Sequence, residues 1–188
     1  YTPRGSNTKI NIKQDIKLMI DNTKTIKPDT QFKFDDAILG LKSNDFCPVE
    51  VVDETSLSAA NRIQSQLKIE NVCVLNFASA TQPGGGFLHG RQAQEEYLSR
   101  SSMLYGSIKS QKEMYDYHKR YYNPRHTDYM IYSPRVPVIR NDDGNLIPPY
   151  YISIITSAAV NFNQILQEYY DQKQLLGTNS VDNNENND

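Results

Sequence analysis

The sequence has few cysteines and no long apolar segment. Its 188 residues include two cysteines, Cys47 and Cys73, which are too few for a disulfide framework. No apolar run approaches the ~20 residues that a membrane-spanning helix requires, so we expect no membrane association. The N-terminus shows no signal peptide. Together these absences predict a protein of a reducing intracellular compartment, cytoplasmic or nuclear.

The sequence also lacks an excess of either charge. Its formal net charge is −2, whereas a general nucleic-acid binder usually carries a basic face, so we expect no general nucleic-acid binding. A phosphate ligand stays compatible with this charge, because backbone N–H groups and helix N-termini bind phosphate without a cationic side chain. The three histidines, His89, His118 and His126, do not have the spacing of metal ligands, so no metal site is predicted.

The apolar pattern predicts one α/β domain. Helical spacing is present over residues 11–26, 56–69 and 93–109, and strand-like stretches are 49–53, 71–78, 129–140 and 150–159. The succession of strand, helix and strand favours a sheet with helices packed on it. A domain over residues 10–176 is expected, followed by a polar tail, "GTNSVDNNENND", that is predicted to be disordered over 177–188.

One of these strands is unusually apolar. Residues 71–78, "NVCVLNFA", form a near-continuous apolar run, which is typical of a strand buried on both faces. Cys73 lies inside this run and is interpreted as a small buried hydrophobe. The strand leads into "SATQPGGG", so Asn76 and Ser79 are placed at the carboxyl edge of the sheet, where ligands bind in open α/β folds.

Three consecutive glycines, Gly84, Gly85 and Gly86, follow that strand. Without a Cβ, the chain adopts positive φ easily and approaches a ligand closely, and successive N–H groups form an anion-binding nest. A glycine triplet alone is as typical of a tight turn or a flexible loop. The position of the triplet directly after an apolar strand favours ligand binding.

Two adjacent carboxylates follow the glycines. Glu95 and Glu96 would lie about 100° apart on a helix, so they do not fit the opposed acid and nucleophile of an ordinary glycosidase. One could act as a general acid, with a pKa raised by low-dielectric surroundings, while the other orients ligand hydroxyls. The alternative is a pair of solvated charges in the first turn of a helix, where they favour the helix dipole.

The combined pattern G-G-G-x7-Q-E-E after a strand resembles the signature of poly(ADP-ribose) glycohydrolases. The stretch "VLNFASATQPGGGFLHGRQAQEEYLSRSS" is similar to their microbial-type branch, as is "MIYSPRVPVIRNDDGNLIPPYYISIITSAA". The resemblance covers roughly residues 10–163. It implies a macrodomain-like three-layer α/β/α sandwich with a mixed sheet, which binds ADP-ribose in a crevice at the strand ends.

The resemblance also implies an activity and a set of residue roles. The expected reaction is hydrolysis of the ribose–ribose O-glycosidic bond in poly(ADP-ribose), with Glu96 as the catalytic acid and Glu95 holding ribose hydroxyls. The other implied ligand-binding residues are Asn76, Ser79, Gly84, Gly85, Gly86 and Gln94. Gln94 would brace the loop, and no cofactor or metal is implied. The expected substrate is poly(ADP-ribose) or an ADP-ribosylated protein, and the expected state is a monomer.

The C-terminal part departs from that family. There, a strand like "ISIITSAA" is followed by a helix, a further buried strand and a second glycine-rich loop over the phosphates. After Ala159 this sequence shows neither the buried strand nor the loop, so the domain is expected to be C-terminally incomplete. Two other functions are therefore kept open: an ADP-ribose reader without turnover, and an inactive fragment. The tyrosine-rich stretch 114–122 would either stack an adenine or pack half-buried.

Overall fold

The structure is a computed structural model that describes residues 1–32 and 49–178. In chain order, its elements are α1 (Lys13–Asn22), β1 (Lys24–Ile26), α3 (Ser56–Ser65), β2 (Cys73–Ala78), η1 (Phe87–His89), α4 (Gln94–Ser101), α5 (Leu104–Ser110), α6 (Lys112–Arg120), β3 (Met130–Arg140), β4 (Leu146–Ala158) and α7 (Phe162–Thr178). The tail predicted to be disordered lies outside the described residues, apart from 177–178, which end α7.

The described strands form one mixed sheet in the order β1-β3-β4-β2. β2 runs parallel to β4, whereas β3 is antiparallel to both of its neighbours. β3 and β4 are joined by the turn 141–145, in which Gly144 has a φ of +77°, as expected for a glycine in a hairpin turn. The α/β class and the mixed sheet predicted from the sequence are confirmed.

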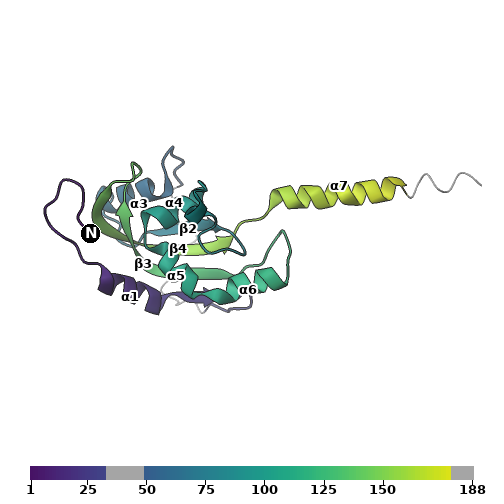
Figure 1. Ribbon diagram of the computed structural model, residues 1–188, viewed down its shortest axis with the longest axis horizontal. Helices are drawn as coiled ribbons and strands as arrows, with labels where there is room; N and C mark the ends of the chain where they lie inside the picture. Colours follow the sequence, from purple (N-terminus) through teal and green to yellow (C-terminus); the bar gives the residue numbers. More distant parts are fainter. Residues whose placement is uncertain (33–48, 179–188) are drawn as a thin grey trace, which may run out of the picture.

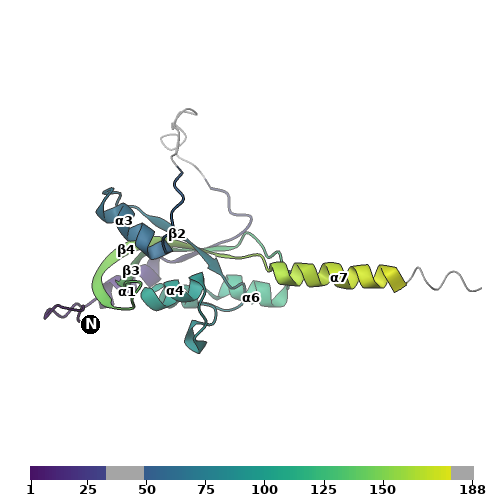
Figure 2. The ribbon, with the colours of Figure 1, turned by 90° about the horizontal axis from the view of Figure 1, so that it is seen from above.

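The core lies on one face of this sheet. Alternate strand residues such as Val74, Ile131 and Ile154 point toward that face, and apolar side chains from α4, α5 and α6 cover them. Figure 2 shows α4 and α6 on the same side of the sheet. Such helices form because their apolar residues recur every three or four positions, so one stripe is buried against the sheet. This layer places the start of α4 beside the end of β2.

The other face of β2 differs from the sequence prediction. β2 alternates between exposed and buried residues, with Leu75 46% and Phe77 59% exposed, so it is not buried on both faces. Cys73 shares the exposed face, and its interpretation as a buried hydrophobe is wrong. The reason is that α4 covers the other face of β2, whereas α3 leaves Leu75 and Phe77 exposed. Cys47 lies outside the described residues.

Three further elements differ from the expected ones. The strand predicted over 49–53 is wrong: residues 49–55 form no strand, and the valines there pair with none of the strands in the described residues. The helix predicted over 11–26 ends at Asn22, because Thr23 turns to extended backbone and the chain continues into β1. The helix predicted over 93–109 is interrupted at Ser102, which is extended and bridges to Val138 of β3.

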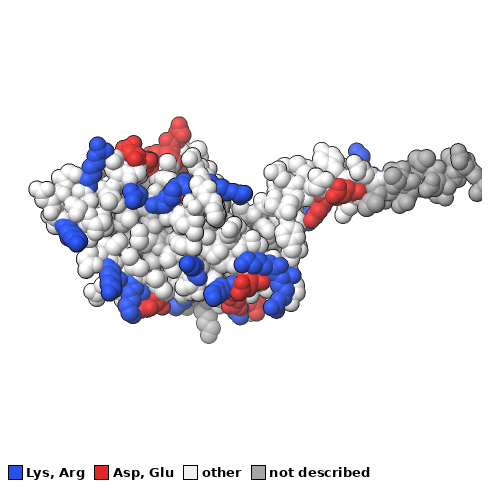
Figure 3. All heavy atoms as spheres, in the orientation of Figure 1, with Lys and Arg blue, Asp and Glu red and all other residues white. Residues whose placement is uncertain are grey.

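The last helix leaves the body of the molecule. Figure 1 shows α7 extending away from the sheet and from the other helices. The backbone bond from Asn161 N–H to Pro124 O, 2.8 Å long, ties the start of this segment to the loop before β3, and Tyr122 and Arg125 of that loop contact Gln164 and Glu168 of α7. None of the helices in residues 1–32 and 49–178 is long and apolar enough to cross a membrane. Figure 3 shows basic and acidic side chains interspersed over the visible surface.

Candidate active site

The end of β2 supplies two of the expected ligand-binding residues in different surroundings. Asn76 is fully buried on the helix-covered face, where its Nδ2 donates to Thr156 Oγ1 at 3.1 Å. Its Oδ1 has no hydrogen-bond partner among the described residues. Ser79 begins the loop, and its Oγ accepts from the Gln82 N–H at 3.2 Å. Asn76 therefore supports the site from inside, whereas Ser79 shapes the turn that leads to the glycines.

Glu95 joins the strand end to the glycine loop. Its Oε2 accepts from the Ser79 N–H at 2.8 Å, and its Oε1 accepts from the Gly84 N–H at 3.1 Å. The side chain is only 3% exposed. Burial disfavours the charged form and raises the pKa of the Glu95 carboxyl to about 7, although the hydrogen bonds from Ser79 and Gly84 act in the opposite direction. Near neutral pH this carboxyl is therefore partly protonated.

Glu96 contacts the same loop at Gly86. Its Oε1 accepts from the Gly86 N–H at 2.9 Å, and the residue is 6% exposed. Glu95 and Glu96 lie in the first turn of α4 but bond to different backbone groups, as their angular separation on a helix requires. The alternative of two solvated charges is wrong, because both carboxyls are buried under the loop.

The glycine loop folds over these carboxyls at very close range. Gly84 and Gly85 have φ values of +72° and +56°, which glycine adopts without strain. A Cβ on Gly85 would overlap Glu96 Oε1 and would lie 3.0 Å from Glu95 Oε2. Glycine is thus required at this position both by backbone conformation and by space.

The expected anion nest is not formed in this loop. The N–H groups of Gly84 and Gly86 donate to Glu95 and Glu96, and the Gly85 N–H donates to Gln82 O at 2.9 Å. All three donors are therefore engaged within the protein. The physical reason is that the buried carboxylates need hydrogen-bond donors, and the loop amides are the donors within reach.

Gln94 fixes the start of α4 to the free edge of β2. Its Oε1 accepts from the Phe77 N–H at 2.9 Å, and its Nε2 donates to Leu75 O at 2.7 Å. These two backbone groups point away from β4, so the side-chain amide satisfies them as a neighbouring strand would. This contact fixes the position of Glu95 and Glu96, the next two residues, relative to the end of β2.

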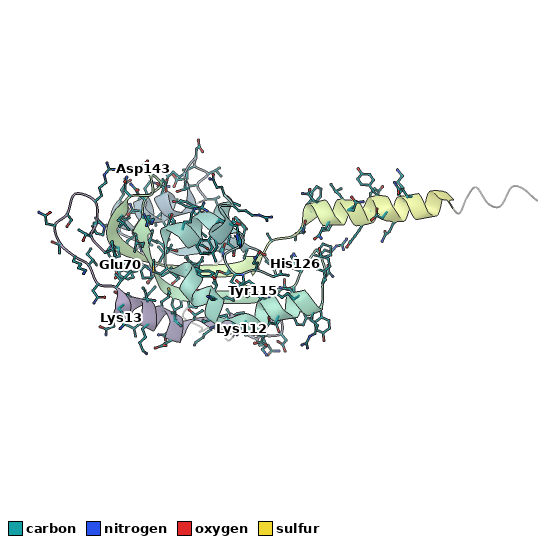
Figure 4. The ribbon with its side chains drawn as sticks, in the orientation of Figure 1. Lys13, Glu70, Lys112, Tyr115, His126 and Asp143 are labelled. Atoms are coloured by element: carbon teal, nitrogen blue, oxygen red, sulfur yellow. The ribbon has the colours of Figure 1, made fainter. Side chains whose placement is uncertain are left out.

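Helix α6 brings Tyr115 and His118, which are not among the expected site residues, toward the site. Tyr115, labelled in Figure 4, is buried, and burial together with the nearby Glu95 raises its pKa. His118 is buried too, and its Nε2 lies 2.8 Å from Thr127 Oγ1. Burial lowers the pKa of His118, so the imidazole is neutral at pH 7. The helical spacing of Met114, Tyr115 and His118 was the available signal.

The part of the chain that the structure describes holds no group of three or more His, Cys, Asp or Glu side chains that could bind a metal ion. Of the tyrosine-rich stretch, Tyr115 packs in the core, whereas Tyr117 and Tyr121 are exposed with their ring centroids 4.9 Å apart. The stretch therefore combines packing with an exposed aromatic surface.

Known proteins with similar sequences and structures place this chain in a family. A family model described as microbial-type PARG, catalytic domain, where PARG is poly(ADP-ribose) glycohydrolase, matches residues 1–141. The poly(ADP-ribose) glycohydrolase of Thermomonospora curvata is 38% identical, with a TM-score of 0.78 over 88% of this chain and 60% of that chain. Its structure with the inhibitor ADP-HPD gives 38% identity and a TM-score of 0.76, over 88% of this chain and 58% of that one.

A second bacterial enzyme gives the same result. The poly(ADP-ribose) glycohydrolase of Deinococcus radiodurans in complex with ADP-ribose is 35% identical, with a TM-score of 0.70 over 84% of this chain and 63% of that chain. Among curated proteins there is no match. The fold is thus the macrodomain-like α/β fold of these glycohydrolases. The chain belongs to the microbial-type poly(ADP-ribose) glycohydrolase family, and it spans about 60% of the length of these relatives.

Proposed function

We propose that this chain carries the catalytic glutamates of a poly(ADP-ribose) glycohydrolase, which hydrolyses ribose–ribose O-glycosidic bonds and releases ADP-ribose. The observation that carries the proposal is the pair of buried carboxyls, Glu95 and Glu96, held by backbone N–H groups of the glycine loop. The relatives solved with ADP-ribose and with ADP-HPD support a ligand of this class.

In the proposed mechanism Glu96 is the general acid and base. Its Oε1 is held by the Gly86 N–H, which fixes the carboxyl and leaves the second oxygen for the substrate. The protonated carboxyl donates its proton to the leaving ribose oxygen as the glycosidic C–O bond breaks, which leaves an oxocarbenium ion. The resulting carboxylate then takes a proton from the water that attacks this ion, and the acid is restored.

Glu95 has a positioning role beside it. Both of its oxygens already accept one backbone N–H group, but each carboxylate oxygen has a second lone pair. We therefore assign to Glu95 the anchoring of the loop on the strand end and a hydrogen bond from a ribose hydroxyl. With a pKa of about 7, it also donates a hydrogen bond in its protonated form.

The remaining roles follow from the loop geometry. Because the N–H groups of Gly84 and Gly86 are held by the glutamates, we assign to the glycines a close surface contact with the diphosphate and the distal ribose. Ser79 lies at the turn beside them, while Asn76 holds the sheet side of the site through Thr156. Gln94 braces α4 against β2.

The substrate is proposed to be the polymer or an ADP-ribosylated protein, and the acting species a monomer. The experiment is release of ADP-ribose from poly(ADP-ribose) by the chain and by Glu96→Gln. Removal of a general acid is expected to slow the reaction at least ~10²-fold. Glu113→Gln, an exposed change on α6, is the matched control and should keep the rate. Equal rates for the chain and for Glu96→Gln would contradict the role of Glu96.

A second candidate is an ADP-ribose reader, which is favoured by the fact that the chain spans about 60% of its relatives' length. A reader would bind ADP-ribose but would release none from the polymer. Its Glu96→Gln variant would bind ADP-ribose with the same affinity. Retention of both buried glutamates argues for the enzyme, because a reader does not need an acid. An intracellular location stays a prediction from composition.

A further inference from the structure

A cavity lies between η1, α4 and the β3–β4 turn. It has a volume of about 730 Å³. The residues that matter for its chemistry are Phe87, Arg100, Arg140 and Asp142. Asp143, next to Asp142 in the β3–β4 turn, and His126, in the loop before β3, are labelled at opposite ends of the sheet in Figure 4. The Asp142 wall of the cavity therefore lies at the hairpin end, whereas Phe87 directly follows the glycine loop, so the cavity extends toward that loop.

Two arginines from different elements reach this cavity. Arg100 Nη1 donates to Arg91 O at 2.6 Å, and Arg140 Nη1 donates to Gly144 O at 2.8 Å. A guanidinium group has five N–H donors, so each arginine keeps most of its donors. Neither side chain takes part in an ion pair within residues 1–32 and 49–178. In Figure 3 a band of basic side chains crosses the surface over α4.

Ser99, which precedes Arg100 on α4, is 5% exposed at the cavity wall. Its Oγ is enclosed by protein and has no hydrogen-bond partner among the described residues, so it does not face a ligand in the cavity. The charged groups of the cavity are therefore the ones that select a ligand.

The hairpin that carries Arg140 also offers an acceptor. The carboxylate of Asp142 accepts from the hydroxyls of Tyr97 and Thr55, the latter at 3.0 and 3.1 Å to its two oxygens. With two cations and one anion, the cavity favours a ligand that is anionic at one end. The carboxylate still has lone pairs for a ligand hydroxyl at the other end.

We propose that this cavity binds a phosphorylated sugar, with the phosphate oxygens at Arg100 and Arg140 and a sugar hydroxyl donating to Asp142. Planar guanidinium groups bind phosphate in bidentate fashion, which a sugar without phosphate could not use. The chemistry is shared by free sugar phosphates and by the ribose phosphates within a polymer. The cavity adjoins the glycine loop at Phe87, but Arg100, Arg140 and Asp142 are not residues of the proposed active site.

One residue connects the two sites. Phe87 lines the cavity, and its ring packs against Tyr105 with 4.7 Å between centroids. The same ring lies 3.0 Å from the position that a Cβ on Gly84 would occupy, so it supports the glycine loop from behind. A ligand in the cavity would contact the residue that holds the loop over Glu95.

The test is a titration of the ¹⁵N-labelled chain with ribose 5-phosphate, followed by NMR. The backbone amides of Ser99, Arg100 and residues 141–144 are expected to shift saturably. Arg100→Ala and Arg140→Ala should each weaken binding about 10-fold or more, because each removes charge-assisted hydrogen bonds. Asp142→Asn should weaken ribose 5-phosphate more than inorganic phosphate. Arg120→Ala, on the exposed face of α6, is the control and should leave the affinity unchanged.

Three outcomes would overturn the proposal: no saturation up to about 10 mM ligand, shifts confined to residues 79–86, or unchanged affinity in both arginine variants. Equal binding of inorganic phosphate and ribose 5-phosphate would overturn the sugar assignment. A short poly(ADP-ribose) distinguishes the two sources. If the polymer shifts the amides of residues 79–86 together with those of residues 99–100 and 141–144, the polymer is the ligand. If only ribose 5-phosphate shifts the amides of residues 99–100 and 141–144, the ligand is a free sugar phosphate. Either result supports the site.

Discussion

At the scale of single residues, the candidate site depends on buried carboxyls that satisfy backbone donors. Glu95 bonds to Ser79 and Gly84, and Glu96 bonds to Gly86, so each carboxyl both fixes the loop and is oriented by it. A small change in either partner is therefore transmitted directly to the carboxyl that we propose as the general acid. This mutual positioning explains why the loop consists of glycines.

Gly85→Ala tests the space that the loop requires. The new Cβ would overlap Glu96 Oε1, and alanine is strained at a φ of +56°. We expect ADP-ribose affinity and turnover to fall at least ~10-fold and the free energy of unfolding to fall by about 1–3 kcal/mol. Gly144→Ala is the matched control, since its φ is +77° and its Cβ would contact nothing within 4 Å. Equal losses of affinity in the two variants would refute the steric argument.

Glu95 should make stability depend on pH. Its folded-state pKa is raised from 4.5 to about 7, so the folded state binds more protons between these values than the unfolded state. The free energy of unfolding should therefore fall as pH rises from about 4.5 to 7, by up to about 3 kcal/mol. The measurement is urea denaturation across this range for the chain and for Glu95→Gln. The difference in the free energy of unfolding between the two proteins isolates Glu95 from His118 and other titrating groups. If that difference did not change with pH, the raised pKa of Glu95 would be contradicted.

At the scale of elements, the sequence pattern predicted α3, β2 and β3, because apolar spacing acts locally. The pattern failed where tertiary contacts decide the structure. The stretch 49–53 has strand composition but pairs with no strand among the described residues, and Ser102 interrupts a helical pattern by bridging to β3. The position of the glycines and glutamates was predictable, but the engagement of the loop N–H groups by the carboxyls was not, since it depends on how α4 meets β2.

Gln94→Glu tests how α4 is attached to β2. A carboxylate still accepts from the Phe77 N–H but cannot donate to Leu75 O, and it faces that carbonyl with a negative charge. We expect a loss of about 1–3 kcal/mol in the free energy of unfolding. Gln172→Glu, on the exposed surface of α7, should change stability by less than about 0.5 kcal/mol. Similar small effects in both variants would show that the Gln94 contact contributes little.

At the scale of the whole molecule, α4 and α6 lie on one side of the sheet, and Leu75 and Phe77 of β2 are exposed on the other. The chain spans about 60% of the length of its bacterial relatives, and the glutamates and the glycine loop lie within the matched part. The mixed sheet was implied by the family resemblance, whereas the exposed side chains of β2 were not predicted, because a near-continuous apolar strand does not show which side its neighbours cover.

The central claim is that the described residues build an ADP-ribose site around Glu95 and Glu96. The most direct measurement is a calorimetric titration of ADP-ribose into the chain, combined with thermal unfolding. We expect saturable one-to-one binding that raises the Tm, and a clear weakening of this binding in Gly85→Ala but not in Gly144→Ala. A cooperative unfolding transition without any binding of ADP-ribose would contradict the claim.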